Sequence, residues 1–168
     1  MEYNADPNKK TPIIIVLLLL ILGLAFAFAP ALFQDLPSWY FQLPAVISLL
    51  ICILFLSRYV LTSYTYQLYD AGNTMSPYPK LNVYRIRKAG SRMVYCIPFN
   101  NVVSIEKRTK VEKLDIKSEN LCASMFPENV YCVVFVVDQK EAIFIECDER
   151  FAALIRERID LYSEVMEN

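Results

Sequence analysis

Five basic side chains near the middle of the chain are the residues best suited to bind a ligand: Lys80, Arg85, Arg87, Lys88 and Arg92. Arg85 and Arg87 are two residues apart in a segment whose apolar residues alternate, so in a strand both side chains point to one face. Guanidinium and ammonium groups form charge-assisted hydrogen bonds with phosphate and carboxylate oxygens. The pattern predicts a site for an anionic lipid headgroup or an acidic segment of a protein partner; the alternative is a solvated basic face that binds nothing.

These residues belong to a wider separation of charge along the chain. Residues 80–117 contain ten Lys and Arg against three Asp and Glu, whereas residues 118–168 contain four against eleven. The overall net charge of −1 hides this polarity. Beneath an anionic leaflet each basic group near the surface gains about 1 kcal/mol. We therefore expect the basic segment to lean toward lipid.

The residue types needed for catalysis or metal binding are scarce. The sequence has no His, and its five Cys form no CxxC pair, so a zinc site is not expected. It also lacks a Gly-rich phosphate loop and a nucleophile elbow. We expect no enzymatic activity, no metal and no cofactor. Nucleic-acid binding is not expected either, because Tyr84 and Tyr95 beside the basic cluster alternate like core residues.

Two apolar stretches precede this cluster and determine where it can act. Residues 13–33 and 39–57 carry no ionisable side chain and are separated by only five residues. About 20 helical residues span the hydrocarbon core of a bilayer, and backbone groups in lipid must be paired within a helix. The sequence therefore predicts an antiparallel transmembrane hairpin. The expected organisation is an N-terminal tail over 1–12, the hairpin over 13–62 and a soluble domain over 63–168.

The basic residues beside the hairpin predict its orientation. Lys9, Lys10 and Arg58 flank the outer ends of the two stretches, whereas the short connection carries only Asp35. Positive charge marks the cytoplasmic side, so we expect a multi-pass protein of the cell membrane with both termini in the cytoplasm. Aromatic rings and a snorkelling guanidinium are typical of membrane interfaces, and the expected anchors are Trp39, Tyr40, Arg58 and Tyr59.

One alternative would reverse this topology. Lys9 and Lys10, the apolar run and the sequence Ala27-Phe28-Ala29 together imitate a cleavable secretory signal. The run continues to residue 33, longer than a usual signal core. We therefore expect the segment to be retained.

The apolar period changes from helical to two at Ser63, which indicates a β-rich soluble domain. A final amphipathic helix follows, with Asp148 as its N-cap and an apolar stripe that should pack on the sheet. The fold class is α+β. The expected strands are 63–69, 81–88, 93–97, 102–108, 113–119, 131–137 and 142–147, and the helix stripe is Phe151, Leu154, Ile155, Ile159, Tyr162 and Val165.

The last two strands also allow a prediction about the cysteines. In a hairpin closed by residues 138–141, Val137 faces Ala142, and counting outward places Cys132 opposite Cys147. Such a pair could be bridged in an oxidising compartment, whereas we expect free thiols in a cytoplasm.

Several short sequences in the soluble part resemble bacterial pleckstrin-homology-like (PH-like) domains fused to membrane helices. They are Tyr66-Gln67-Leu68, the run from Leu81 to Arg87, and the run from Ile97 to Glu106 that contains Ile97-Pro98-Phe99 and Ser104-Ile105-Glu106. The resemblance implies a bent sheet or partly open barrel of about seven strands, capped by the C-terminal helix, and no single activity. Eukaryotic members often read inositol phosphates with a basic residue followed by Arg-x-Arg; Lys80 stands closer to Arg85 than that motif has.

The expected function is a membrane-anchored PH-like binding or scaffold module on the cytoplasmic face, in contact with anionic lipid or an acidic protein partner. The alternative is a structural or assembly subunit that associates with itself or another membrane protein through the hairpin. Gly23 and the alanines that follow it offer a small-residue surface for such packing, although packing within the hairpin also explains them.

Overall fold

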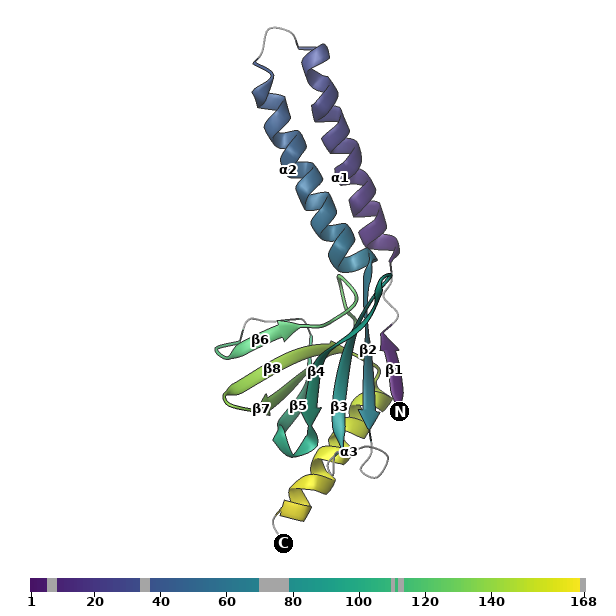
Figure 1. Cartoon of the computed structure of the whole chain (residues 1–168), viewed down its shortest axis with the longest axis vertical. Coiled ribbons are helices and arrows are strands. Elements are labelled where there is room, and N and C mark those ends of the chain that lie inside the picture. Colours follow the sequence, from purple (N-terminus) through teal and green to yellow (C-terminus); the bar gives the residue numbers. More distant parts are fainter. Residues whose placement is uncertain (6–8, 34–36, 70–78, 110, 112–113, 167–168) are drawn as a thin grey trace. The chain divides into compact units, whose positions relative to one another are not determined.

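The chain forms two compact units in a computed structural model that describes residues 1–5, 9–33, 37–69, 79–109, 111 and 114–166 (Figure 1). One unit comprises Asn8–Thr62. The other combines Met1–Pro7 with Ser63–Asn168. The N-terminal residues therefore belong to the same unit as the soluble domain.

The first unit is a helical hairpin. α1 covers Lys10–Phe28 and continues into the 3₁₀ turn η1, Ala29–Ala31; α2 covers Trp39–Phe55 and ends in the π-helical turn η2, Leu56–Val60. Lys10–Ala31 and Trp39–Val60 each contain 22 residues, with mean hydropathies of 3.0 and 2.2. Both are long and apolar enough to cross a membrane, which indicates membrane association.

Small and weakly polar side chains join the two helices. The hydroxyl of Ser48 donates to the carbonyl of Leu19 at 2.8 Å. A Cβ added at Gly23 would lie 3.4 Å from Cγ of Leu49 and 3.5 Å from the Ser48 hydroxyl. Gly23 therefore faces α2, and a Cβ there would make ordinary van der Waals contact with it.

Among the residues that the structure describes, the second unit contains eight strands in two sheets, instead of the expected bent sheet of about seven strands. Sheet A has the order β1-β2-β3-β4 and sheet B the order β5-β7-β8-β6. The strand bounds are Glu2–Ala5 (β1), Thr62–Tyr69 (β2), Lys80–Arg87 (β3), Gly90–Pro98 (β4), Val102–Arg108 (β5), Lys117–Asn120 (β6), Val130–Val136 (β7) and Lys140–Glu146 (β8), with a 3₁₀ turn at Phe99–Asn101 (η3) and α3 at Glu149–Met166.

Strand β1 is the element that the sequence did not predict, because residues 1–12 were expected to form a tail. It pairs antiparallel with β2, with Glu2 opposite Gln67 and Ala5 opposite Tyr64. The N-terminal ammonium group of Met1 also donates to the carbonyl of Leu68 at 2.8 Å. A strand of four residues is too short to show a period, and its partner lies far along the chain.

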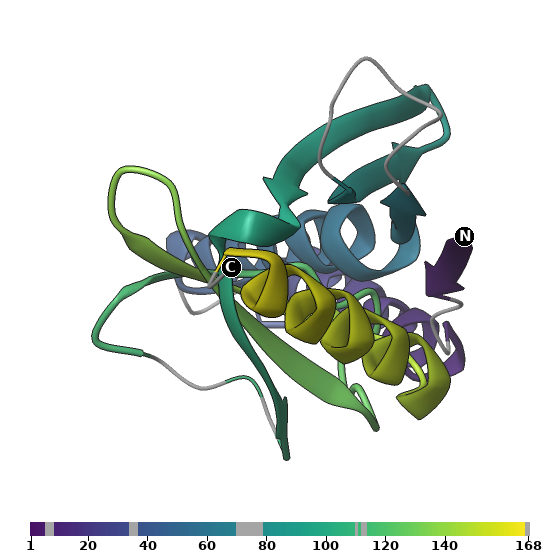
Figure 2. The same cartoon turned by 90° about the horizontal axis from the view of Figure 1, so that it is seen from below.

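The two sheets and α3 share one hydrophobic core. Tyr66 and Leu81 from sheet A, Val133 and Ile143 from sheet B, and Phe151 from α3 are all fully or almost fully buried in it. Figure 2 shows α3 running across the space between the teal strands of sheet A and the green strands of sheet B. Apolar faces of both sheets are thereby covered by one helix.

Helix α3 confirms the predicted cap and stripe. The backbone N–H of Phe151 donates to Oδ1 of Asp148 at 2.7 Å. Phe151 and Ile155 are buried, and Leu154, Ile159 and Tyr162 pack partly buried against the same core. Nothing is described for the side chain of Val165.

The predicted pairing of Cys132 with Cys147 is wrong. Cys132 lies opposite Phe144, and Val136 lies opposite Lys140, so the hairpin closes through the three residues 137–139. The turn starts one residue earlier and ends two residues earlier than expected, so the register shifts by three residues and Cys147 lies beyond the paired part of β8.

Candidate binding site

The segment that we call the basic turn, residues 85–92, comprises the end of β3, the two connecting residues and the start of β4, and it contains all three predicted arginines. The register places Arg85 opposite Arg92 and Arg87 opposite Gly90. Gly90 has a φ of 140°, a conformation that residues with a Cβ rarely adopt. A Cβ built there would meet no atom within 4 Å. The glycine is therefore required by the backbone of the turn and not by crowding.

An open pocket of about 280 Å³ lies at this turn. Its lining residues are Arg85, Arg87, Ala89, Gly90, Ser91 and Arg92. Like charges directly opposite each other in a sheet are destabilising, and Arg85 and Arg92 are such a pair. An anion held between the guanidinium groups would remove this repulsion and form charge-assisted hydrogen bonds.

The two predicted lysines are placed differently. Lys80 begins β3 and lies opposite Pro98, at the far end of the strand from the turn. Lys80 is seven positions from Arg87, which corresponds to a distance of about 23 Å along the strand at the usual rise per residue. Lys88 is exposed in the turn itself, beside the residues that line the pocket. The structure thus brings Arg85, Arg87 and Arg92 together and separates Lys80 from them.

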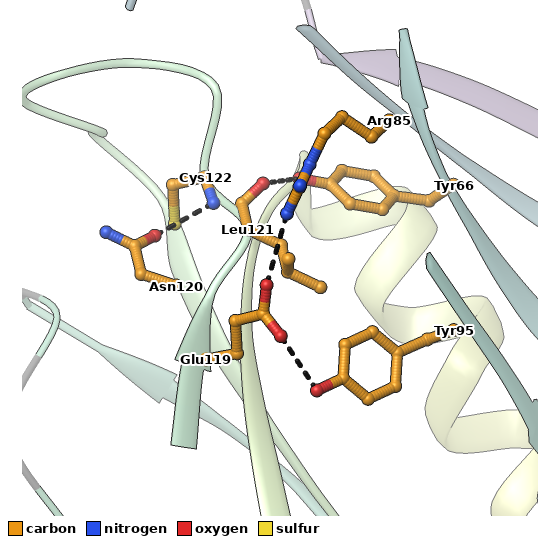
Figure 3. Close-up of polar contacts among 7 residues, drawn as sticks. All are labelled: Tyr66, Arg85, Tyr95, Glu119, Asn120, Leu121 and Cys122. Carbon is orange, nitrogen blue, oxygen red and sulfur yellow. Dashed lines mark hydrogen bonds and ion pairs between the residues drawn. The ribbon is translucent and has the colours of Figure 1, made fainter. Parts of the chain in front are cut away.

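Arg85 has a carboxylate partner that the sequence did not predict. Its Nη2 lies 3.2 Å from Oε1 of Glu119 on β6, and the Tyr95 hydroxyl donates to Oε2 of the same carboxylate at 2.9 Å (Figure 3). We call these two contacts the Glu119 bridge. Because Arg85 and Tyr95 belong to sheet A and Glu119 to sheet B, the bridge joins the two sheets.

The side chains of the Glu119 bridge are partly exposed, and the pKa of Tyr95 in the bridge is raised. The Arg85 side chain is 33% exposed and that of Glu119 is 41% exposed. Burial, followed by the hydrogen bond and the charge of Glu119, raises the pKa of Tyr95 to about 12. The guanidinium carbon of Arg85 also lies 5.7 Å from the centre of the Tyr64 ring, within the range of a cation–π contact. Arg85 is therefore oriented from two sides.

A second contact between the sheets follows β6 directly. The buried hydroxyl of Tyr66 donates to the carbonyl of Leu121 at 3.0 Å and accepts from the N–H of Glu146 at 3.2 Å. Burial raises the pKa of Tyr66 well above its usual value. Asn120 Oδ1 accepts from the N–H of Cys122 at 2.9 Å. The chain directly after β6 is thus fixed to sheet A through Tyr66 (Figure 3).

The basic turn lies at the end of sheet A from which the chain connects to the helical unit. Ala5, the last residue of β1, is opposite Tyr64 near the start of β2. Arg85, near the end of β3, lies over the ring of that same Tyr64. The chain leads from β1 toward α1 and from η2 into β2, so both connections leave sheet A at this end.

The predicted interface anchors lie at the two ends of α2 and its extension. Trp39 and Tyr40 are exposed in its first turn, with ring centroids 4.0 Å apart. Arg58 and Tyr59 are half-buried in η2, with the guanidinium carbon 5.8 Å from the ring centre. Their role at a membrane interface stays a prediction.

The part of the chain that the structure describes contains no group of three or more His, Cys, Asp or Glu side chains that could hold a metal ion. Comparisons of the chain with models of known protein families, with characterised proteins and with solved structures found no match.

Proposed function

We propose that this protein is a membrane-anchored binding module of PH-like architecture whose basic turn contacts anionic lipid headgroups. The observation that carries the proposal is the set of three arginines around one open pocket, with Arg85 and Arg92 directly opposite each other. The strand meander, the second sheet and the helix that packs between them support the PH-like assignment.

The position of the turn supports a lipid ligand. Strand β2 starts at Thr62, two residues after η2 ends at Val60, so the end of sheet A that carries the turn is covalently close to the second apolar helix. A short tether keeps the effective concentration of headgroups near the basic turn high, so that even a site of low affinity is occupied. In this proposal Lys9, Lys10 and Arg58 mark the cytoplasmic side, where anionic lipids are enriched.

The expected energy is modest and depends on salt. Three arginines near an anionic surface contribute about 3 kcal/mol together, which corresponds to roughly a hundredfold preference for anionic over neutral lipid. The attraction is screened over a Debye length of about 8 Å at physiological ionic strength. Contact should therefore weaken as salt is added.

The test uses the full-length chain, because a fragment that starts at Ser63 would lack the edge strand β1. Hydrogen exchange of residues 87–92 is measured in nanodiscs of phosphatidylcholine alone and of phosphatidylcholine mixed with phosphatidylserine. We expect slower exchange with phosphatidylserine, and loss of this protection when Arg87 and Arg92 are both replaced by Gln. Equal exchange in both lipids would refute the proposal.

The matched control is the double replacement of Lys107 and Lys140 by Gln. Both lysines are exposed on sheet B, and the change in net charge is the same as in the arginine pair. The proposal requires the control to keep the lipid-dependent protection. If it loses as much protection as the arginine pair, the effect reflects net charge and not the pocket.

A further inference from the structure

Glu119 is in a position to compete with any anion that enters the basic turn. Arg85 lines the pocket and also forms the ion pair of the Glu119 bridge. Its Nε is buried and has no hydrogen-bond partner in the described part of the chain. Arg85 therefore lines the pocket and is also paired with Glu119, a carboxylate of the same chain.

Strand β6, which carries Glu119, is weakly held. It has four residues, forms the outer edge of sheet B and pairs only with β8 in the described structure. Lys117 and Ser118 are exposed, and Lys117 forms its 2.7 Å ion pair with Glu141 at the surface. Short segments with little buried apolar area open most easily. Beyond β6, Leu121 is fixed by the Tyr66 hydroxyl.

We propose, on the basis of the proposed headgroup contact, that Glu119 regulates the basic turn: an anionic headgroup displaces Glu119 from Arg85 and thereby loosens β6. The displaced carboxylate also leaves Tyr95, because both contacts belong to the same side chain. Leu121 remains in place and acts as the fixed end of the movement. Binding of a headgroup at sheet A thus changes the stability of the edge of sheet B. By thermodynamic linkage, any ligand that keeps β6 paired with β8 weakens headgroup binding.

The strength of the competition follows from the exposure of the bridge. A partly exposed ion pair changes an equilibrium by about fivefold at most. Replacing Glu119 with Gln removes the charge and keeps a side chain that can still accept from Tyr95. We therefore expect E119Q to need less phosphatidylserine than the wild-type protein for half-maximal protection of residues 87–92, by a factor of up to about five.

The experiment follows hydrogen exchange of residues 87–92 and of Lys117–Asn120 in the full-length chain, in the same two kinds of nanodisc. In the wild-type protein, phosphatidylserine should slow exchange in the turn and accelerate it in β6. In E119Q, β6 should exchange faster even in phosphatidylcholine. Glu157→Gln, which removes an exposed carboxylate from α3, is the matched control and should behave like the wild-type protein.

The outcomes separate this inference from the proposed function. Protection of the turn without any lipid effect on β6, and with equal lipid requirements in E119Q and E157Q, overturns the regulation and leaves the headgroup contact standing. Absence of turn protection refutes both. Tyr95→Phe removes one contact of Glu119 without changing the charge. If Glu119 competes with the headgroup, the lipid requirement of Tyr95→Phe should lie between those of the wild-type protein and E119Q. If the bridge is purely structural, β6 should exchange faster in both Tyr95→Phe and E119Q, and their lipid requirement should equal that of the wild-type protein.

Discussion

Replacing Tyr66 with Phe should destabilise the soluble domain more than any other loss of a single hydroxyl group. The Tyr66 hydroxyl is buried between the sheets, where it donates to the Leu121 carbonyl and accepts from the Glu146 N–H. Phe fills the same space except for the oxygen atom. The substitution therefore leaves the buried Leu121 carbonyl and the partly buried Glu146 N–H without this partner.

The magnitude follows from those two groups. A buried donor or acceptor without a partner costs about 1–3 kcal/mol. The partly buried Glu146 N–H belongs at the lower end of this range, so the two groups together cost about 2–4 kcal/mol. In a domain of this size, 1 kcal/mol lowers the unfolding midpoint by about 4–8 °C. We expect the Tm of the β-rich unit to fall by roughly 8–30 °C.

The assay is thermal unfolding of the full-length protein in phosphatidylcholine nanodiscs, followed by near-ultraviolet circular dichroism. Tyr69→Phe is the matched control, because the Tyr69 hydroxyl donates at 2.6 Å to Gln67 on the same strand and is only partly buried. That change should cost less than about 0.5 kcal/mol. If Y66F and Y69F shift the midpoint equally, Tyr66 does not connect the sheets in the way described.

Three further predictions concern the cap, the Glu119 bridge and the thiols. Asp148→Ala removes the N-cap bond of α3 and should cost about 1 kcal/mol in thermal unfolding, with Asp148→Asn close to wild type; equal losses in both variants would contradict the capping role. The Tyr95 pKa is raised to about 12, so the stability due to its neutral phenol is fully present below about pH 10 and is lost as the pH rises through about 12. The free energy of unfolding should therefore fall less steeply with rising pH in Tyr95→Phe than in the wild-type protein. An equal slope in the two proteins would argue against a raised Tyr95 pKa. Cys96 is exposed, whereas burial raises the pKa of Cys147 to about 12; iodoacetamide should therefore modify Cys96 first in the native protein, as mass spectrometry of peptides can show, and comparable rates would disprove the burial of Cys147.

The elements with strong local patterns could be predicted from the sequence. Two uncharged apolar runs are sufficient to predict the helices of the hairpin, because length and composition act locally. The C-terminal helix was predicted with its cap at Asp148 and its stripe at Phe151 and Ile155, since capping and the 3.6-residue period are also local. The expected strands agree with β2–β5, β7 and β8 to within about three residues. For the expected strand 113–119, β6 begins only at Lys117, and residue 113 lies outside the described residues.

Features that depend on pairing between distant segments could not be predicted in this way. Strand β1 forms by pairing with β2, and the hydrogen bond from Met1 to Leu68 joins residues 67 positions apart. The register of the β7–β8 hairpin depends on a turn that is one residue shorter than its composition suggested. The division into two sheets likewise depends on which strands meet, and a residue period carries no information about partners.

The same distinction applies to the candidate site. The sequence by itself determined that arginines at positions 85 and 87 share one strand face and that the chain carries two apolar helices. Only the tertiary structure decided that Arg92 lies opposite Arg85, that Lys80 lies at the other end of the strand, and that Glu119 reaches Arg85 from 34 positions away. The physical reason is that charge and apolar period are properties of neighbouring residues, whereas an ion pair between two sheets forms only after the shared core has brought those sheets together.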